Sequence, residues 1–263
     1  MSPHDVAYYG LSIVLLLLLA YAARHALGVG RASTGRAPRR GLGQACRRRA
    51  LGVGLAATGT VLALVVGVAV TEIWWRFDAL NADAATARLY QQARFSLWYV
   101  AFALILFGIV AAVAPAPRAR PSHGADRRWV ATRLLLWALF AIAVGVAAAH
   151  LFNADTYAIT RSGSRFNAVQ QRVFYLPLIV ATALGAALAA GSALRAADAA
   201  TRRRLAWLAS FAALLLLGLL AEATIIPGIG DLAVLEAFIP FTAAGGCLCL
   251  AARSLPTGGP ARD

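Results

Sequence analysis

Residues 96–114 read SLWYVAFALILFGIVAAVA, a run that contains no charged side chain. An α-helix needs about 20 mainly apolar residues to cross the hydrocarbon core of a bilayer. Six further runs of comparable length and hydropathy occur, at residues 6–28, 51–73, 130–152, 173–194, 205–222 and 232–252. We therefore predict an all-α polytopic membrane protein, in which residues 1–263 form a single transmembrane domain built as a seven-helix bundle.

The composition of the 263-residue chain also indicates a protein that is surrounded by lipid. Hydrophobic residues make up 60% of the chain and charged residues only 14%, whereas a soluble domain usually has about 25% charged residues. All 25 basic residues are arginines, because the chain contains no lysine. Chemistry that needs a lysine amine, such as a Schiff base to retinal, is therefore excluded, and with it the light-driven seven-helix rhodopsins.

The arginines predict the orientation of the bundle in the membrane. Nineteen of the 25 lie in every second connection, at the helix ends beside it or in the carboxy-terminal tail, and six lie on the opposite side. The most basic connection is residues 29–50, which we predict to be a cytoplasmic loop. Because short arginine-rich loops stay in the cytoplasm, we predict an outside amino terminus and a cytoplasmic carboxy terminus.

The same distribution predicts which partners the arginines meet. Arginines beside the inner leaflet attract anionic headgroups by about 1 kcal/mol each, so we expect the Arg-rich loops to bind the lipids of the anionic inner leaflet. Basic patches also bind nucleic acid. Here the arginines are divided among loops that are anchored to a membrane, and we predict no nucleic-acid partner. Nothing in the pattern indicates an oligomeric state.

Ionisable residues cluster at the predicted outer ends of the spans. Charged side chains inside a membrane are costly and by default mark a functional or paired site. The candidate ligand-binding residues are Glu72, His150, Glu222, Asp231, Glu236 and, near the start of the fifth span, Tyr175. If the helices pack as a bundle, these side chains line one outward-facing polar pocket for a cation, a proton or a small polar ligand. The alternative is that they lie in the hydrated headgroup zone and only terminate their helices.

Three functions are compatible with such a pocket. A receptor-like or accessory protein would bind a small ligand in it, whereas a transporter or exporter of a small or lipid-like molecule would use the carboxylates for cation or proton coupling. A membrane enzyme would hold a metal at Glu72, His150 and Glu222, but no HxxxH, ExxH or CxxC spacing supports a metal site. A site closed toward the cytoplasm favours the receptor, and a polar path past the middle of the membrane favours transport.

The sequence pattern favours a protein without enzymatic activity, and we predict neither catalytic residues nor a cofactor. A haem between two helices needs two histidines at a similar depth. His25 lies at the predicted inner side and His150 at the outer side, so these two cannot share one haem.

Two short sequence motifs that each occur twice on the predicted outer side suggest a repeated helical hairpin. Residues 81–83 (Asn-Ala-Asp) recur at 153–155, and the Gln-Gln pair at 91–92 recurs at 170–171. The spacing between the two motifs differs between the first and the second copy, so a repeat requires an insertion. The other interpretation is chance similarity in an alanine-rich chain.

Three short features accompany the seven-span pattern: Arg24-His25 at the end of the first span, a charged and aromatic stretch over residues 72–78, and Glu236 at the start of the last span. With the topology of the whole chain, these resemble fungal seven-helix integral membrane proteins of the orphan receptor-like and lipid-translocating-exporter-like families. The resemblance implies a multi-pass protein of the plasma membrane that senses or moves an apolar small molecule and has no enzymatic activity.

Overall fold

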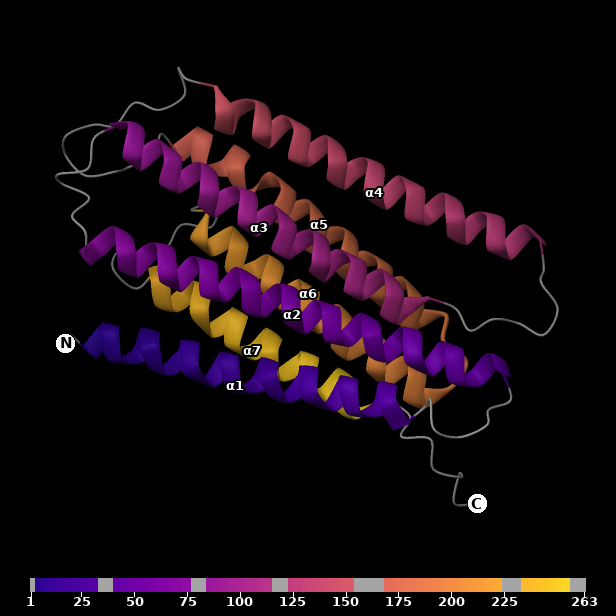
Figure 1. Ribbon diagram of the computed structural model, residues 1–263. Helices are drawn as coiled ribbons and strands as arrows, with labels where there is room; N and C mark the ends of the chain where they lie inside the picture. Colours follow the sequence, from indigo (N-terminus) through magenta and orange to yellow (C-terminus); the bar gives the residue numbers. More distant parts are fainter. Residues whose placement is uncertain are drawn as a thin grey trace.

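The computed structural model describes residues 3–32, 40–76, 84–114, 123–153, 168–223 and 233–255. Side chains are described for 9–30, 45–67, 89, 92–114, 127–153, 172–223 and 239–255. The described ranges contain seven α-helices and no strand, which confirms the predicted all-α class (Figure 1). The helices are α1 (Pro3–Ala32), α2 (Arg40–Arg76), α3 (Ala84–Val113), α4 (His123–Phe152), α5 (Ala168–Leu194), α6 (Ala199–Glu222) and α7 (Ala233–Arg253).

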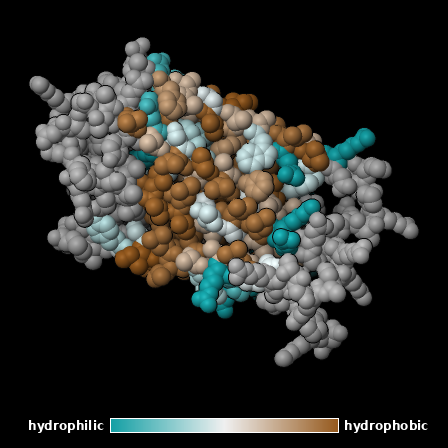
Figure 2. Space-filling view, in the orientation of Figure 1, coloured by the Kyte–Doolittle hydropathy of each residue, from teal (hydrophilic) through white to brown (hydrophobic). Residues whose placement is uncertain are grey.

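Six of the helices, α1 to α6, are long and apolar enough to cross a membrane. Their apolar stretches are 22 to 26 residues long, and a rise of 1.5 Å per residue carries such a stretch across a hydrocarbon core of about 30 Å. In α7 the described apolar stretch is shorter, Ile239–Arg253. Figure 2 shows the hydrophobic residues as a broad band across the visible face. The protein is therefore a multi-pass membrane protein.

The helices form two layers of three, with the remaining helix at the side. One layer contains α1, α2 and α3, and the other contains α7, α6 and α5 (Figure 1). Because α1 packs on α7 and α3 packs on α5 at the two margins, these six helices form a closed ring of neighbours. Helix α4 lies outside the ring and packs mainly on α5.

Much of the segment that we predicted as a basic loop, residues 29–50, is helical. Helix α1 continues to Ala32 and α2 begins at Arg40, and residues 33–39 lie outside the described residues. Arginine, alanine and leucine are good helix formers. Ala45 and Ala50 are also buried against the rest of the bundle, so packing holds in helical form a segment whose composition resembles a linker.

Glycines bring α2 and α3 into backbone contact. A Cβ atom on Gly59 would lie 2.6 Å from the carbonyl oxygen of Ala101, and one on Gly52 would collide with the backbone of Ala112. From the other side, a Cβ atom on Gly108 would lie 2.5 Å from the backbone nitrogen of Ala56. Small residues allow this close approach between membrane helices. The contact fixes how α3 lies along α2.

The space between the two layers is filled by apolar side chains. The largest fully buried ones are Tyr175, Phe174, Phe211, Leu15, Leu19, Ile105, Leu106, Ile109, Leu151, Leu178, Leu208 and Leu219. The buried hydroxyl of Thr60 donates to Ala56 O at 2.8 Å, and that of Thr182 donates to Leu178 O at 2.8 Å. Each of these hydroxyls is thus satisfied within its own helix and offers little polarity to a path through the bundle.

Candidate functional site

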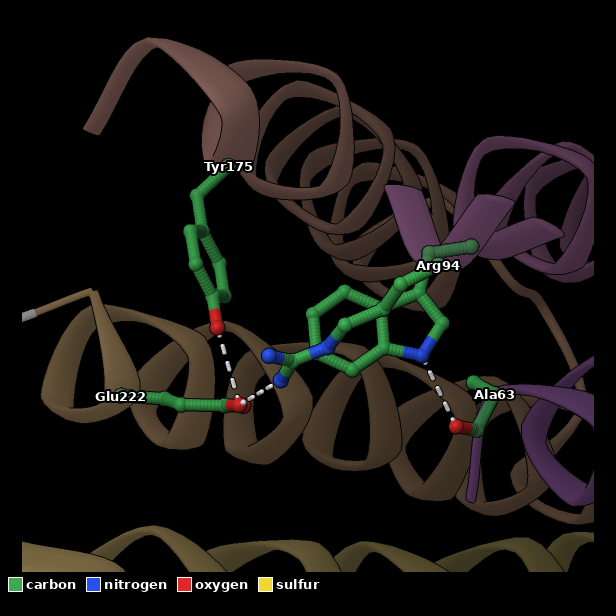
Figure 3. A network of polar contacts seen from close by, with 5 residues as sticks. Ala63, Arg94, Tyr175 and Glu222 are labelled. Atoms are coloured by element: carbon green, nitrogen blue, oxygen red, sulfur yellow. Dashed lines mark hydrogen bonds and ion pairs between the residues drawn. The ribbon is translucent and has the colours of Figure 1, made fainter. Parts of the chain in front are cut away.

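Three helices bring polar residues together at the end of the bundle where the chain begins, which we call the amino-terminal end. Helices α3 and α5 start at this end and α6 finishes there. Arg94 lies in the third turn of α3, Tyr175 in the second turn of α5, and Glu222 is the last residue of α6. Because α5 packs on both α3 and α6, an arginine, a tyrosine and a carboxylate lie side by side (Figure 3).

The carboxylate of Glu222 is the centre of this group. The Tyr175 hydroxyl donates to Glu222 Oε1 at 2.8 Å, and Arg94 Nη2 donates to the same oxygen at 3.2 Å. Tyr175 is fully buried, whereas the side chains of Arg94 and Glu222 are 19% and 30% exposed. The ion pair is therefore partly exposed, while the buried tyrosine contacts the same carboxylate oxygen.

Aromatic rings hold the guanidinium group of Arg94 in place. Its Cζ lies 4.2 Å from the ring centroid of Trp98 and 5.7 Å from that of Phe95. A cation over an indole face is attracted by the ring quadrupole. The indole is itself fixed, because Trp98 Nε1 donates to Ala63 O of α2 at 3.0 Å. Arg94 is thus held from one side by Glu222 and from another by an immobile ring.

Arg94 has one buried donor atom that no described residue uses. Its Nε is buried and has no hydrogen-bond partner among the described residues. A buried N–H group without an acceptor costs free energy, so an additional acceptor at this position would be bound favourably. The donor lies beside the buried aromatic side chains of Phe95 and Trp98, so its surroundings are apolar.

Hydrogen bonds to backbone carbonyls lock the surrounding helices. Tyr99 OH donates to Phe174 O of α5 at 3.1 Å, and Gln92 Nε2 donates to Leu151 O of α4 at 3.2 Å. Both donors are on α3, within five residues of Arg94. Helix α3 is therefore tied to its neighbours immediately around the ion pair, which keeps Arg94 in register with α5.

The structure brings together two of the six residues that the sequence predicts for the site, Tyr175 and Glu222. His150 is exposed in the last turn of α4, a helix that packs mainly on α5. Glu72 and Glu236 belong to α2 and α7, but their side chains lie outside the described residues, as does Asp231 altogether. The hypothesis of one pocket lined by all six therefore stays a prediction, and the described residues contain the contact between Tyr175 and Glu222.

Arg94 is the residue that the sequence analysis missed as a site residue. It stands two residues before the uncharged run at 96–114 and was counted only as one arginine of the less basic side. A usable signal was present, because Arg94 and Trp98 are four residues apart and such residues share a helix face. Its partner Glu222 lies 128 positions away, a separation at which no local pattern reports a contact.

The part of the chain with described side chains contains no group of three or more His, Cys, Asp or Glu that could hold a metal ion. Within the metal hypothesis, Glu72 lies outside this part. Glu222 already accepts from Tyr175 and Arg94, so a metal cation there would have to compete with the guanidinium.

No protein-family model, curated protein or solved structure matches the chain.

Proposed function

We propose that the protein is a receptor-like or accessory membrane protein that binds a small ligand at the Arg94, Tyr175 and Glu222 site. In this proposal the amino-terminal end faces outward from the plasma membrane, as the arginine distribution predicts. The carrying observation is the partly exposed ion pair with a free buried donor, Arg94 Nε, beside aromatic rings. The resemblance to receptor-like seven-helix proteins agrees with this role.

The chemistry of the site indicates the class of ligand. The Nε–H group of Arg94 lacks an acceptor among the described residues, and the buried rings of Phe95 and Trp98 make its surroundings apolar. A small molecule with a carboxylate or another anionic acceptor and a short apolar body meets both requirements. Such a ligand competes with Glu222 for the guanidinium, because both present oxygen acceptors. Binding would then loosen the link between α3 and the last residue of α6.

Packing below the site favours a receptor over a transporter. Between the two layers the described core is apolar, with Ile105, Ile109 and Leu208 fully buried. Glycine contacts seal α2 against α3. Ion and proton pathways through membranes need polar or hydrated groups along their length. This apolar packing supports a site that is closed toward the other end of the bundle.

A transporter or exporter coupled to protons is the second candidate. One observation favours it: the Glu222 carboxylate is 30% exposed and is held by an arginine, so protonation of the carboxylate would remove the ion pair. The closed apolar core makes this the alternative and not the first choice.

The test uses the purified protein in lipid nanodiscs and a probe pair of equal length, hexanoate and hexylamine. We expect hexanoate to raise the unfolding temperature saturably and hexylamine to have no such effect. Arg94→Gln removes the guanidinium donors and should abolish the effect of hexanoate. Arg172→Gln, which changes an exposed arginine of α5, is the matched control and should keep it.

The proposal is overturned if hexanoate raises the unfolding temperatures of Arg94→Gln and Arg172→Gln equally. It is also overturned if hexanoate and hexylamine have the same effect on the wild type. Uptake of hexanoate into proteoliposomes that depends on Arg94 would instead support the transporter alternative.

A further inference from the structure

Two runs of three arginines lie at the other end of the bundle, which we call the carboxy-terminal end. Arg47–Arg49 belong to α2 and Arg202–Arg204 belong to α6. In each run the first two side chains are exposed and the third turns inward, so that Arg49 is half-buried and Arg204 is only 3% exposed. This pattern separates one arginine of each run from its solvated neighbours.

Among the described residues, Arg204 is the one charged side chain that is buried. It stands in the second turn of α6, and side chains on a helix lean toward its amino terminus. The guanidinium group is therefore directed toward the end of the bundle, where lipid headgroups lie, and not toward the middle of the membrane. Leu205 and Leu208 are buried beside it on the same helix.

The donors of Arg204 that lack partners lie on one edge of its guanidinium group. Nε and Nη2 are both buried and have no hydrogen-bond partner among the described residues. These two N–H groups point the same way in the planar guanidinium, and together they form the edge that binds two oxygens of one carboxylate or phosphate in parallel. The orphaned donors therefore match an oxyanion.

The charges around Arg204 do not neutralise it. Arg49 acts on it as a second positive charge, and the groups that act in the opposite sense are the carboxylate of Asp198 and the thiol of Cys46. Asp198 is exposed and serves as the N-cap of α6, where its Oδ1 accepts from Thr201 N at 2.6 Å. This hydrogen bond lowers the pKa of Asp198. Its carboxylate is thus engaged at the helix start, and no described carboxylate forms an ion pair with Arg204.

We propose that Arg204, together with Arg49, binds a phosphate group at the carboxy-terminal end of the bundle. An unpaired buried charge is strongly unfavourable, and a phosphate supplies two oxygens to the free edge of Arg204 and negative charge to Arg49. Arginine is the side chain best suited to such bidentate recognition. The phosphate belongs either to the headgroup of an anionic phospholipid or to a soluble phosphate from the adjacent aqueous phase.

This site differs from the general attraction between arginines and an anionic leaflet. Exposed arginines such as Arg48 and Arg203 attract any anionic surface by about 1 kcal/mol each, with screening by salt. A buried pair binds one phosphate at a defined position. The two kinds of arginine therefore give a matched set of variants in which the same charge is removed from adjacent positions.

The experiment measures the unfolding temperature of the purified protein in micelles of dodecyl maltoside, a detergent without phosphate, in a phosphate-free buffer. Phosphatidic acid is added as the lipid probe in one series and inorganic phosphate as the soluble probe in another. The variants are Arg204→Gln and Arg49→Gln, with Arg203→Gln and Arg48→Gln as controls. We expect the wild type and both controls to be stabilised saturably by one of the probes. Arg204→Gln and Arg49→Gln should need at least about tenfold more of this probe for the same stabilisation. A tenfold loss of affinity corresponds to about one charge-assisted hydrogen bond.

The arms of the experiment distinguish the two sources. Saturable stabilisation by phosphatidic acid alone identifies a lipid headgroup, and stabilisation by inorganic phosphate identifies a soluble anion. In these micelles without either probe, we expect Arg204→Gln to unfold at the same temperature as the wild type or at a higher one, because it removes an uncompensated charge. The proposal is overturned if neither probe stabilises the wild type, or if Arg203→Gln loses as much of the stabilisation by the probe as Arg204→Gln does.

Discussion

At the scale of single residues, the site at the amino-terminal end depends on one oxygen atom. Glu222 Oε1 accepts from both Tyr175 and Arg94, so the tyrosine and the arginine are coupled through it. A hydrogen bond to a charged acceptor contributes more than one to a neutral acceptor. Because Glu222 is partly exposed, water reduces the value of its ion pair with Arg94, while the buried tyrosine keeps its contribution.

This difference gives a prediction for tyrosine hydroxyls. Tyr175→Phe should lower the free energy of unfolding by about 1 to 2 kcal/mol, because a charged acceptor loses its donor. Tyr99→Phe removes a hydroxyl that donates to a neutral carbonyl, Phe174 O, and should cost less. Denaturant titrations of both variants in mixed micelles compare the two. Equal costs would contradict the central position that we assign to the Glu222 carboxylate.

At the scale of helices, the position of the site follows from the contact between α2 and α3. Glycines let these two helices touch through their backbones. Trp98 then reaches Ala63 O of α2, and its ring supports Arg94. A shift of α3 along α2 would move the indole away from its acceptor. The apolar helix contact in the middle of the bundle thus controls the geometry of a polar site near its end.

Substitution of one glycine tests this link. Gly108→Ala places a Cβ atom 2.5 Å from Ala56 N, and we expect it to lower the free energy of unfolding by about 1 to 3 kcal/mol. Gly145→Ala on α4 is the control, because nothing lies within 4 Å of the added Cβ atom. It should be neutral or slightly stabilising through its higher helix propensity. Guanidinium or urea titrations give both values, and equal destabilisation would contradict the role of close α2–α3 packing.

The helices themselves were largely predictable, and the contacts between them were not. Hydropathy alone located each apolar run, because lipid imposes the same requirement on every span. The continuation of α2 through Arg47–Arg49 was not predicted, because the composition of that segment resembles a loop and only its packing makes it helical. To recognise Arg94 as a site residue, one must know which helices are neighbours in the bundle. The hydropathy pattern of a single sequence does not show this.

At the scale of the whole molecule, charge is distributed unevenly between the two ends. The amino-terminal end presents the balanced pair of Arg94 and Glu222, and the carboxy-terminal end presents both arginine runs. The positive-inside tendency predicts that the basic end faces the cytoplasm. The proposed ligand site and the proposed phosphate site would then face opposite compartments, with the apolar core between them.

A labelling experiment tests the orientation. In a variant without the native cysteines, we expect Arg40→Cys to react with an impermeant maleimide only after the membrane is permeabilised. Ala84→Cys, at the start of α3, should react in intact cells. The reverse pattern would contradict the outward placement of the Arg94 and Glu222 site.

The position of α4 outside the six-helix ring has a consequence for how this protein tolerates sequence change. The ring is complete without α4, and positions such as Leu134, Leu135 and Ile142 are more than half exposed. Side chains that face lipid at these positions need to be apolar, but they do not need a particular shape. Helix α4 is therefore free to diverge among apolar residues over most of its circumference. Its strictest constraint is expected near Leu151, whose carbonyl oxygen receives Gln92 beside the ligand site.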